Sequence, residues 1–186
     1  MLAYIFVLVA VAVRFLILGI TPHPFAFTPV AAALLYFGAR GSRRQLWVPF
    51  VLLAASDVIL TKFVYAYQFS WDHFVTWAWY AAILWLCTSL RENASLRAAT
   101  DWLRVGGASL ASSVSFFVVS NFAVWACWNM YPKTFAGLMA CYDAGLPFFR
   151  RGLAGDLVFT ALMFGVPAVA ALIARSGKTH GTAAAA

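Results

Sequence analysis

Three ionisable side chains and one amide interrupt the apolar stretches of this chain. They are Arg14, Asp57, Asp156 and Asn121. A charged group at the centre of a membrane-crossing helix costs about 2.5–3.5 kcal/mol on insertion scales, so such residues usually have a binding or pairing role. At ~1.5 Å of rise per residue, all four fall in the middle or outer half of their apolar segments. Their spacing predicts one polar cluster, built by four helices, that binds a small solute.

Each of these residues also has a purely structural interpretation. Arg14 and Asp57 can neutralise each other as a buried ion pair. Asp156 follows Gly155 near a helix start, where the helix dipole favours a carboxylate. Asn121 can hydrogen-bond across helices only to hold them together. Solute binding and helix packing therefore both remain open as interpretations of the cluster.

A group of aromatic and basic residues lies near one end of the apolar segments. The group consists of Trp125, Tyr131, Lys133, Arg150 and Arg151. Aromatic rings of this kind commonly form interfacial belts, which is the alternative to a binding role. Basic side chains bind carboxylates and phosphates through charge-assisted hydrogen bonds. We expect the polar cluster to open towards this group and His23, and any solute to carry an anionic group.

Catalytic and metal-binding signatures are absent from the sequence. No HExxH, GxSxG, P-loop or GxGxxG pattern occurs, and no Cys/His spacing matches a zinc site. Cys87, Cys127 and Cys141 are expected to pack as small apolar residues. A Cys127–Cys141 disulfide is the alternative if that segment faces an oxidising compartment. We therefore expect no enzyme activity, no metal and no cofactor.

The composition places all these residues in a membrane protein. Of 186 residues, 64% are hydrophobic and 10% are charged, which lies far outside the range of soluble domains. At roughly 20 residues per span, six spans would use nearly the whole chain. The net charge of +7 lies in short loops, as in a topology signal, and not in a nucleic-acid-binding patch. The expected fold is an all-α, compact bundle of about six transmembrane helices whose main partner is the lipid bilayer, with no nucleic acid.

Apolar runs and their breaks predict the individual helices. Prolines end or kink a helix, so the Pro22–Pro24 and Pro132 positions mark boundaries and Pro167 marks a kink. The small residues of the fifth run predict close helix packing, either internally or against a partner subunit. The expected helices cover residues 2–20, 27–39, 46–63, 73–90, 105–128 and 152–174, with an interfacial or re-entrant helix over 133–144.

Basic residues are distributed unevenly between the two sets of loops. Eight lie on the side of the termini, namely Arg40, Arg43, Arg44, Arg91, Arg97, Arg104, Arg175 and Lys178. Four lie on the other side, namely Lys62, Lys133, Arg150 and Arg151. The excess predicts both termini in the cytoplasm of a bacterium, with the protein in the inner membrane. Residues 1–175 are expected to form one transmembrane domain, and residues 176–186 a disordered cytoplasmic tail.

Several short stretches together resemble a family of small, uncharacterised bacterial membrane proteins. The most specific are Asn-Phe-Ala-Val-Trp at 121–125 and Tyr-Pro-Lys-Thr at 131–134, supported by Ser56-Asp57 and Gly155-Asp156. The family is distantly similar to the S components of energy-coupling-factor transporters. That resemblance implies a six-helix protein that captures a vitamin or metal near the outer face and then associates with a scaffold subunit and ATPases. The first helix lacks the Ala-x-x-x-Ala pair that often docks S components to the scaffold.

The resulting prediction is a small-solute binding and uptake protein of the S-component type, with an outward-facing polar pocket. The residues expected to line it are Arg14, Asp57, Asn121, Trp125, Tyr131, Lys133, Arg150 and Asp156. The alternative is a structural or assembly subunit that binds other membrane subunits and transports no solute.

Overall fold

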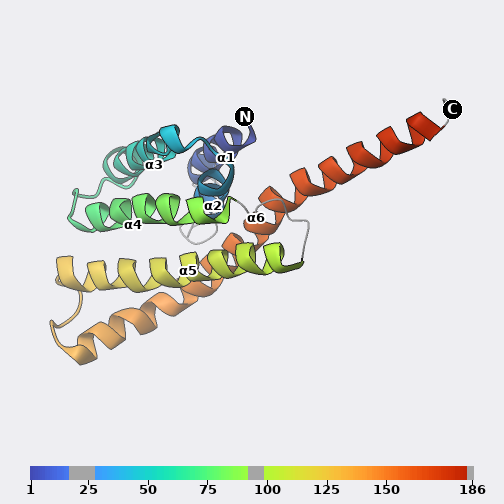
Figure 1. Ribbon diagram of the computed structural model, residues 1–186. Helices are drawn as coiled ribbons and strands as arrows, with labels where there is room; N and C mark the ends of the chain where they lie inside the picture. The colour runs from blue at the N-terminus through green and yellow to red at the C-terminus, as the bar shows by residue number, and fades with distance from the viewer. Residues whose placement is uncertain (17–27, 92–98, 184–186) are drawn as a thin grey trace.

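The computed structural model describes residues 1–16, 28–91 and 99–183, with residues 175–183 described by their backbone alone. Within these ranges every regular element is a helix (Figure 1), which confirms the expectation of an all-helical chain with about six helices. The elements are α1 (Leu2–Leu16), α2 (Val30–Arg40), the 3-10 turn η3 (Arg43–Gln45), α3 (Trp47–Ile59), the π-helical turn η4 (Leu60–Val64), α4 (Asp72–Leu86), the 3-10 turn η5 (Cys87–Leu90), α5 (Ala99–Cys127) and α6 (Phe135–Ala183).

The shortest α-helix, α2, lies at the centre of the molecule. Every residue from Val30 to Ala39 is buried, because α1, α4, α5, α6 and η5 all contact this helix. Alanine and glycine allow the neighbours to approach closely. A Cβ atom on Gly38 would lie 2.6 Å from the Cβ of Cys87, so only glycine fits against η5 at this position.

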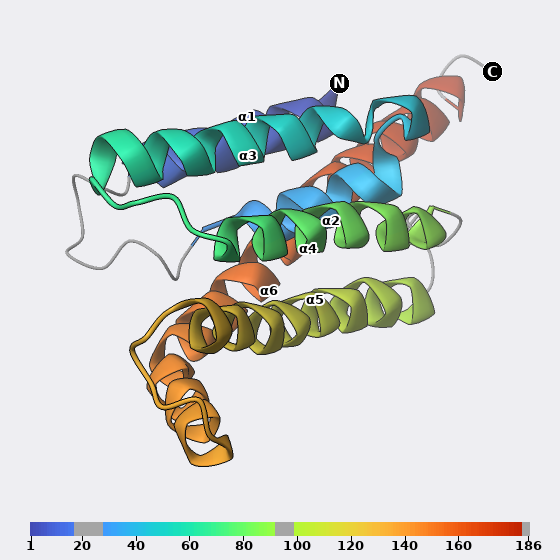
Figure 2. The same cartoon turned by 90° about the vertical axis from the view of Figure 1, so that its left-hand side faces the viewer.

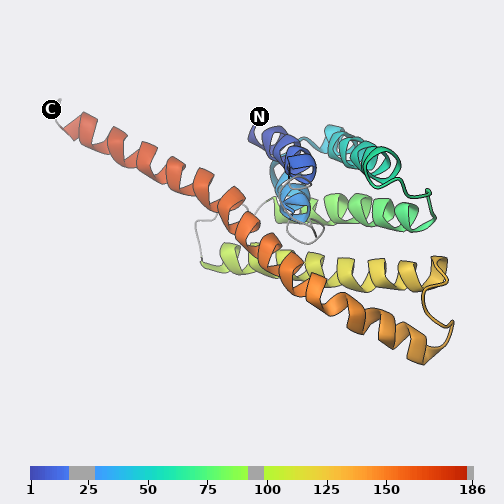
Figure 3. The ribbon, with the colours of Figure 1, turned by 180° about the vertical axis from the view of Figure 1, so that it is seen from behind.

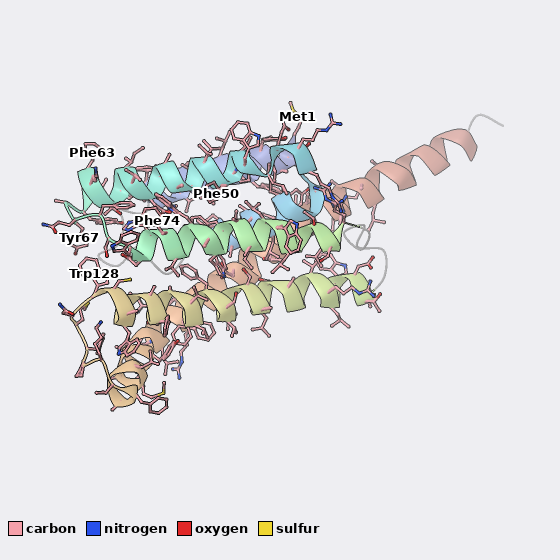
Figure 4. The ribbon with its side chains drawn as sticks, turned by 60° about the vertical axis from the view of Figure 1, so that its left-hand side comes forward. Met1, Phe50, Phe63, Tyr67, Phe74 and Trp128 are labelled. Carbon is pink, nitrogen blue, oxygen red and sulfur yellow. The ribbon has the colours of Figure 1, made fainter. Side chains whose placement is uncertain are left out.

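The helices run alternately up and down, so both termini lie at the same end of the bundle (Figure 2). Figure 4 labels Met1 at that end, and Phe63, Tyr67 and Trp128 at the opposite end. We call these the Met1 end and the Tyr67 end. Connections 65–71 and 128–134 lie at the Tyr67 end, whereas connection 41–46 lies at the Met1 end (Figure 2).

The long helix α6 corrects the prediction of two separate elements over 133–144 and 152–174. It is continuous from Phe135 and includes Pro147 and Pro167. The backbone N–H of Gly137 bonds the hydroxyl of Thr134 at 3.2 Å, as expected for a helix cap, which explains the start at Phe135. A proline removes one backbone hydrogen bond and bends a helix. Because α5 packs along α6, the helix bends without ending, as the change of direction in its first half shows (Figure 2).

Helix α5 also begins earlier than expected, at Ala99 and not at residue 105. Asp101 is buried in its first turn, where a carboxylate suits the positive end of the helix dipole. At the other terminus, α6 continues as helix through residues 176–183, within the predicted tail, and leaves the bundle on the Met1 side (Figure 3).

Three helical stretches of the described chain are long and apolar enough to cross a membrane. They are Arg43–Val64, Ala99–Cys127 and Phe135–Ala174. Large apolar side chains such as Trp85, Leu103 and Val166 are exposed on the outside of the bundle. Exposing so many apolar side chains to water would be unfavourable, whereas the lipid tails of a bilayer accommodate them. The structure therefore agrees with the prediction that the chain is a membrane protein.

Candidate functional site

A buried ion pair joins the first and third α-helices. The Arg14 guanidinium on α1 donates to the Asp57 carboxylate on α3, and the exposed fractions of the two side chains are 17% and 9%. A second guanidinium nitrogen donates to the Ser56 hydroxyl at 2.7 Å. That hydroxyl in turn donates to the backbone carbonyl of Leu53 at 2.7 Å. Arg14 and Asp57 therefore form the ion pair that the structural interpretation predicted.

The same carboxylate connects to α4. Its second oxygen accepts a 3.0 Å hydrogen bond from the indole N–H of Trp77. Both oxygens of Asp57 thus have a partner, as a buried carboxylate requires. The ion pair and this indole hold α1, α3 and α4 in one register.

A second polar group joins α5 to α6. The Ser113 hydroxyl donates to one oxygen of Asp156 at 2.6 Å, and Ser109 lies 3.1 Å from Thr160 one turn away. Because Asp156 lies well inside α6, which begins at Phe135, the helix-start interpretation of this residue is wrong. No ion-pair partner for Asp156 occurs within the described residues.

One cavity connects these two polar groups. Its volume is about 490 Å³, within the range of small-molecule sites. Arg14, Asp57 and Asp156 all line it, together with Ser113 and Tyr80. The lining continues to Tyr67 and Trp128, which lie at the Tyr67 end (Figure 4). Five helices, α1, α3, α4, α5 and α6, therefore supply polar groups to a single cavity.

The cavity lining also contains a histidine, His73, that hydrogen-bonds two neighbouring residues. One ring nitrogen of His73, Nδ1, lies 3.2 Å from the carbonyl of Ser70, which can only accept, so Nδ1 carries the proton. Its other ring nitrogen, Nε2, lies within hydrogen-bonding distance of the Thr61 hydroxyl, at 2.8 Å. Nearby, burial raises the pKa of the Tyr65 phenol, although the positive charge of Arg14 partly opposes this. Tyr65 is therefore a neutral hydrogen-bonding group at pH 7.

Lys133 and Trp125, both predicted to bind solute, lie outside the cavity lining and contact each other. The Lys133 ammonium donates to the backbone carbonyls of Trp125, Ala126 and Trp128, the last at 2.6 Å. The Trp125 indole donates to the Pro132 carbonyl at 2.9 Å. These bonds satisfy carbonyls at the end of α5 that lack partners within the helix. The two residues build the connection between α5 and α6.

Asn121 lies between α5 and α6 and does not line the cavity. Its amide donates to the Phe117 carbonyl at 2.8 Å. A Cβ atom on Gly145 would lie 2.5 Å from the Asn121 side-chain oxygen, so the amide packs directly on the α6 backbone. This position corresponds to the helix-packing alternative.

The remaining predicted residues also lie away from the cavity lining. Tyr131 is half-buried in the 128–134 connection, and Arg150 and Arg151 are exposed on α6. All three cysteines are free, and Cys141 contacts the backbone carbonyl of Asn121 at 3.4 Å. The predicted position of His23 falls outside the described residues.

The sequence did not single out several residues of the cavity. Ser113 was assigned only to small-residue packing, and Asp72 and His73 were not placed in the cluster, nor was Trp77, which bonds Asp57 from outside the lining. Trp77 and His73 lie in an aromatic-rich stretch typical of an interfacial belt, so residue type gave no signal. The partner of Asp156 follows from the alignment of α5 with α6, which a single sequence does not define.

Together, the fold and the cavity define an all-helical protein in which helices long enough to cross a membrane surround a partly polar cavity. The chain belongs to a family of unknown function, DUF6580, whose model matches residues 1–178. This agrees with the expectation of an uncharacterised family. No curated protein and no solved structure matches the chain.

Proposed function

We propose that this chain is a multi-pass membrane protein that binds a small solute in the cavity as the first step of its uptake. The observation that carries the proposal is a single cavity of about 490 Å³ lined by Arg14, Asp57 and Asp156. A cavity that combines a few polar groups with apolar walls is the usual form of a small-molecule site.

The proposed orientation places both termini in the cytoplasm of a bacterium, with the protein in the inner membrane. The excess of basic residues at the Met1 end supports this orientation, including Arg40, Arg43 and Arg91. The Tyr67 end then faces outward, and solute enters past Tyr67 and Trp128. Capture near the outer face is also what the resemblance to S components implies.

The test is native mass spectrometry of the full chain, gently purified in nanodiscs. The wild-type protein is expected to carry a small molecule. Gly152 lines the cavity, so Gly152→Leu is expected to fill part of it and remove that molecule. Gly106→Leu is the matched control, because an added Cβ meets nothing within 4 Å there. Equal occupancy of both variants would refute binding in this cavity.

One observation favours the alternative of a structural or assembly subunit. Gly106 and Gly107 on α5 have open space where a Cβ would project, so these small residues serve no close packing within the described chain. Small residues exposed on a membrane helix permit close approach of another helix. A stoichiometric protein partner without any bound small molecule in the same measurement would support this alternative.

A further inference from the structure

The cavity lining has an excess of carboxylates, which limits the solute that would bind there. Its charged residues are Asp57, Asp72, Asp156 and Arg14, and it also contains His73. Asp57 is neutralised by Arg14. Three carboxylates thus share the lining with one arginine, so acidic groups are in excess there.

Asp156 retains hydrogen-bonding capacity for a ligand. Only one of its oxygens accepts a described hydrogen bond, the 2.6 Å bond from Ser113. A carboxylate in a low-dielectric site is costly unless it meets a positive group. The described residues supply no such group, so a bound cation would stabilise this carboxylate.

Asp72 provides a second, independent indication. Its Oδ1 is buried and has no hydrogen-bond partner in the described part of the chain. The closest basic atom is His73 Nδ1 at 3.6 Å, whose proton already bonds the Ser70 carbonyl. A native structure normally satisfies buried carboxylate oxygens, so this atom indicates a missing donor.

Aromatic rings form much of the remaining wall. They include Trp79, Tyr80, Phe116, Phe117, Trp128 and Phe149. The face of an aromatic ring is electronegative and attracts ammonium groups, most strongly where water is excluded. The same rings also bury an apolar body. The lining thus combines two features that favour organic cations.

We infer that the solute is an organic cation, with an ammonium group or a positively charged ring nitrogen on an apolar or aromatic body. This inference rests on the proposed binding function and adds the class of solute. It departs from the expectation of an anionic group, because Lys133, Arg150 and Arg151 lie outside the cavity lining. The positive group would lie between Asp156 and Asp72, and the apolar body against the aromatic wall.

The test compares three probes of similar size on the full-length protein in nanodiscs. They are benzyltrimethylammonium, its neutral isostere neopentylbenzene, and the anion 3-phenylpropanoate. Binding is measured by isothermal titration calorimetry and by quenching of tryptophan fluorescence, with empty nanodiscs as the blank. The cation is expected to bind at least ~10-fold more tightly than either other probe, as cation–π and carboxylate contacts together predict.

Substitutions at Asp156 then test whether its negative charge contributes to the affinity for the cation. Asp156→Asn keeps an acceptor for Ser113 and nearly the same volume, so the protein should fold, while affinity for the cation falls ~10-fold or more. Asp156→Glu, which retains the charge, should bind more tightly than Asp156→Asn. Asp143→Asn is the matched control on the same helix, since Asp143 is exposed and outside the cavity lining, and it should leave affinity unchanged.

The outcomes separate this inference from the proposed function. Tighter binding of the anion or the neutral probe, or an unchanged affinity in Asp156→Asn, would overturn the organic-cation inference while leaving solute binding intact. If no probe binds and the native protein carries no small molecule, the proposed function itself fails.

Discussion

Lys133 lies 5.6 Å from the centre of the Trp125 ring, and its ammonium bonds the carbonyls at the end of α5. Both residues were expected to contact a solute, and in the structure they contact each other outside the cavity lining. Each has its polar atoms occupied by the backbone of the connection between α5 and α6. Trp125 and the 131–134 stretch therefore stabilise a helix connection, and neither lines the cavity.

Replacing Lys133 by methionine should destabilise the protein without changing solute affinity. The substitution keeps the apolar stem but removes charge-assisted hydrogen bonds to carbonyls, which are worth about 1.5–3 kcal/mol in total. Thermal unfolding in nanodiscs measures the change. Arg150→Met is the control, because Arg150 is exposed on α6. Equal effects of the two substitutions would contradict the capping role of Lys133.

Removing one partner of the Arg14–Asp57 pair should destabilise the protein far more than removing both partners. Arg14→Met removes the positive charge beside a buried carboxylate that still accepts a bond from the Trp77 indole, at an expected cost of about 3–5 kcal/mol. The double variant Arg14→Met with Asp57→Leu should recover most of that loss. Unfolding by denaturant detergent across the double-mutant cycle measures the coupling. Additive effects would show that the pair does not stabilise the fold.

Replacement of glycine by alanine should destabilise the protein at Gly137 but not at Gly107. A Cβ on Gly137 would lie 2.0 Å from the Pro132 carbonyl oxygen, which is backbone and cannot move aside cheaply. Gly137→Ala should therefore lower the unfolding temperature, with a cost of about 1–3 kcal/mol from overpacking. At Gly107 the space is open, and Gly107→Ala should be neutral or stabilising by up to about 1 kcal/mol. A severe loss in Gly107→Ala would instead reveal a partner helix on this face.

Cysteine labelling should report the orientation of the protein. Cys127 is exposed, whereas Cys87 and Cys141 are buried at 5% and 2% exposure. A membrane-impermeant maleimide applied to intact cells should label Cys127 alone if the Tyr67 end faces outward. Cys127→Ser should abolish the label. Labelling that appears only after the membrane is permeabilised would reverse the proposed orientation.

The positions of the helices were largely predictable, because long apolar runs separated by prolines and basic residues carry a strong signal. The continuity of α6 was not, because Pro147 lies within the helix and only packing against α5 shows that the helix bends there without ending. In the cavity, Arg14, Asp57 and Asp156 were recognisable as charges in apolar surroundings. Ser113 and Asp72 were not, because their importance depends on which helices are neighbours.

The complete enclosure of α2 has a consequence for how the protein is made. At ~1.5 Å per residue its 11 residues extend ~16 Å, about half of a hydrocarbon layer of ~30 Å. By itself this segment is too short to remain across a bilayer, and in the finished protein its neighbours separate it from lipid. For the multi-pass arrangement proposed above, a route in which every helix first inserts alone and then associates does not apply to α2. Its insertion must be coupled to the assembly of the helices that surround it.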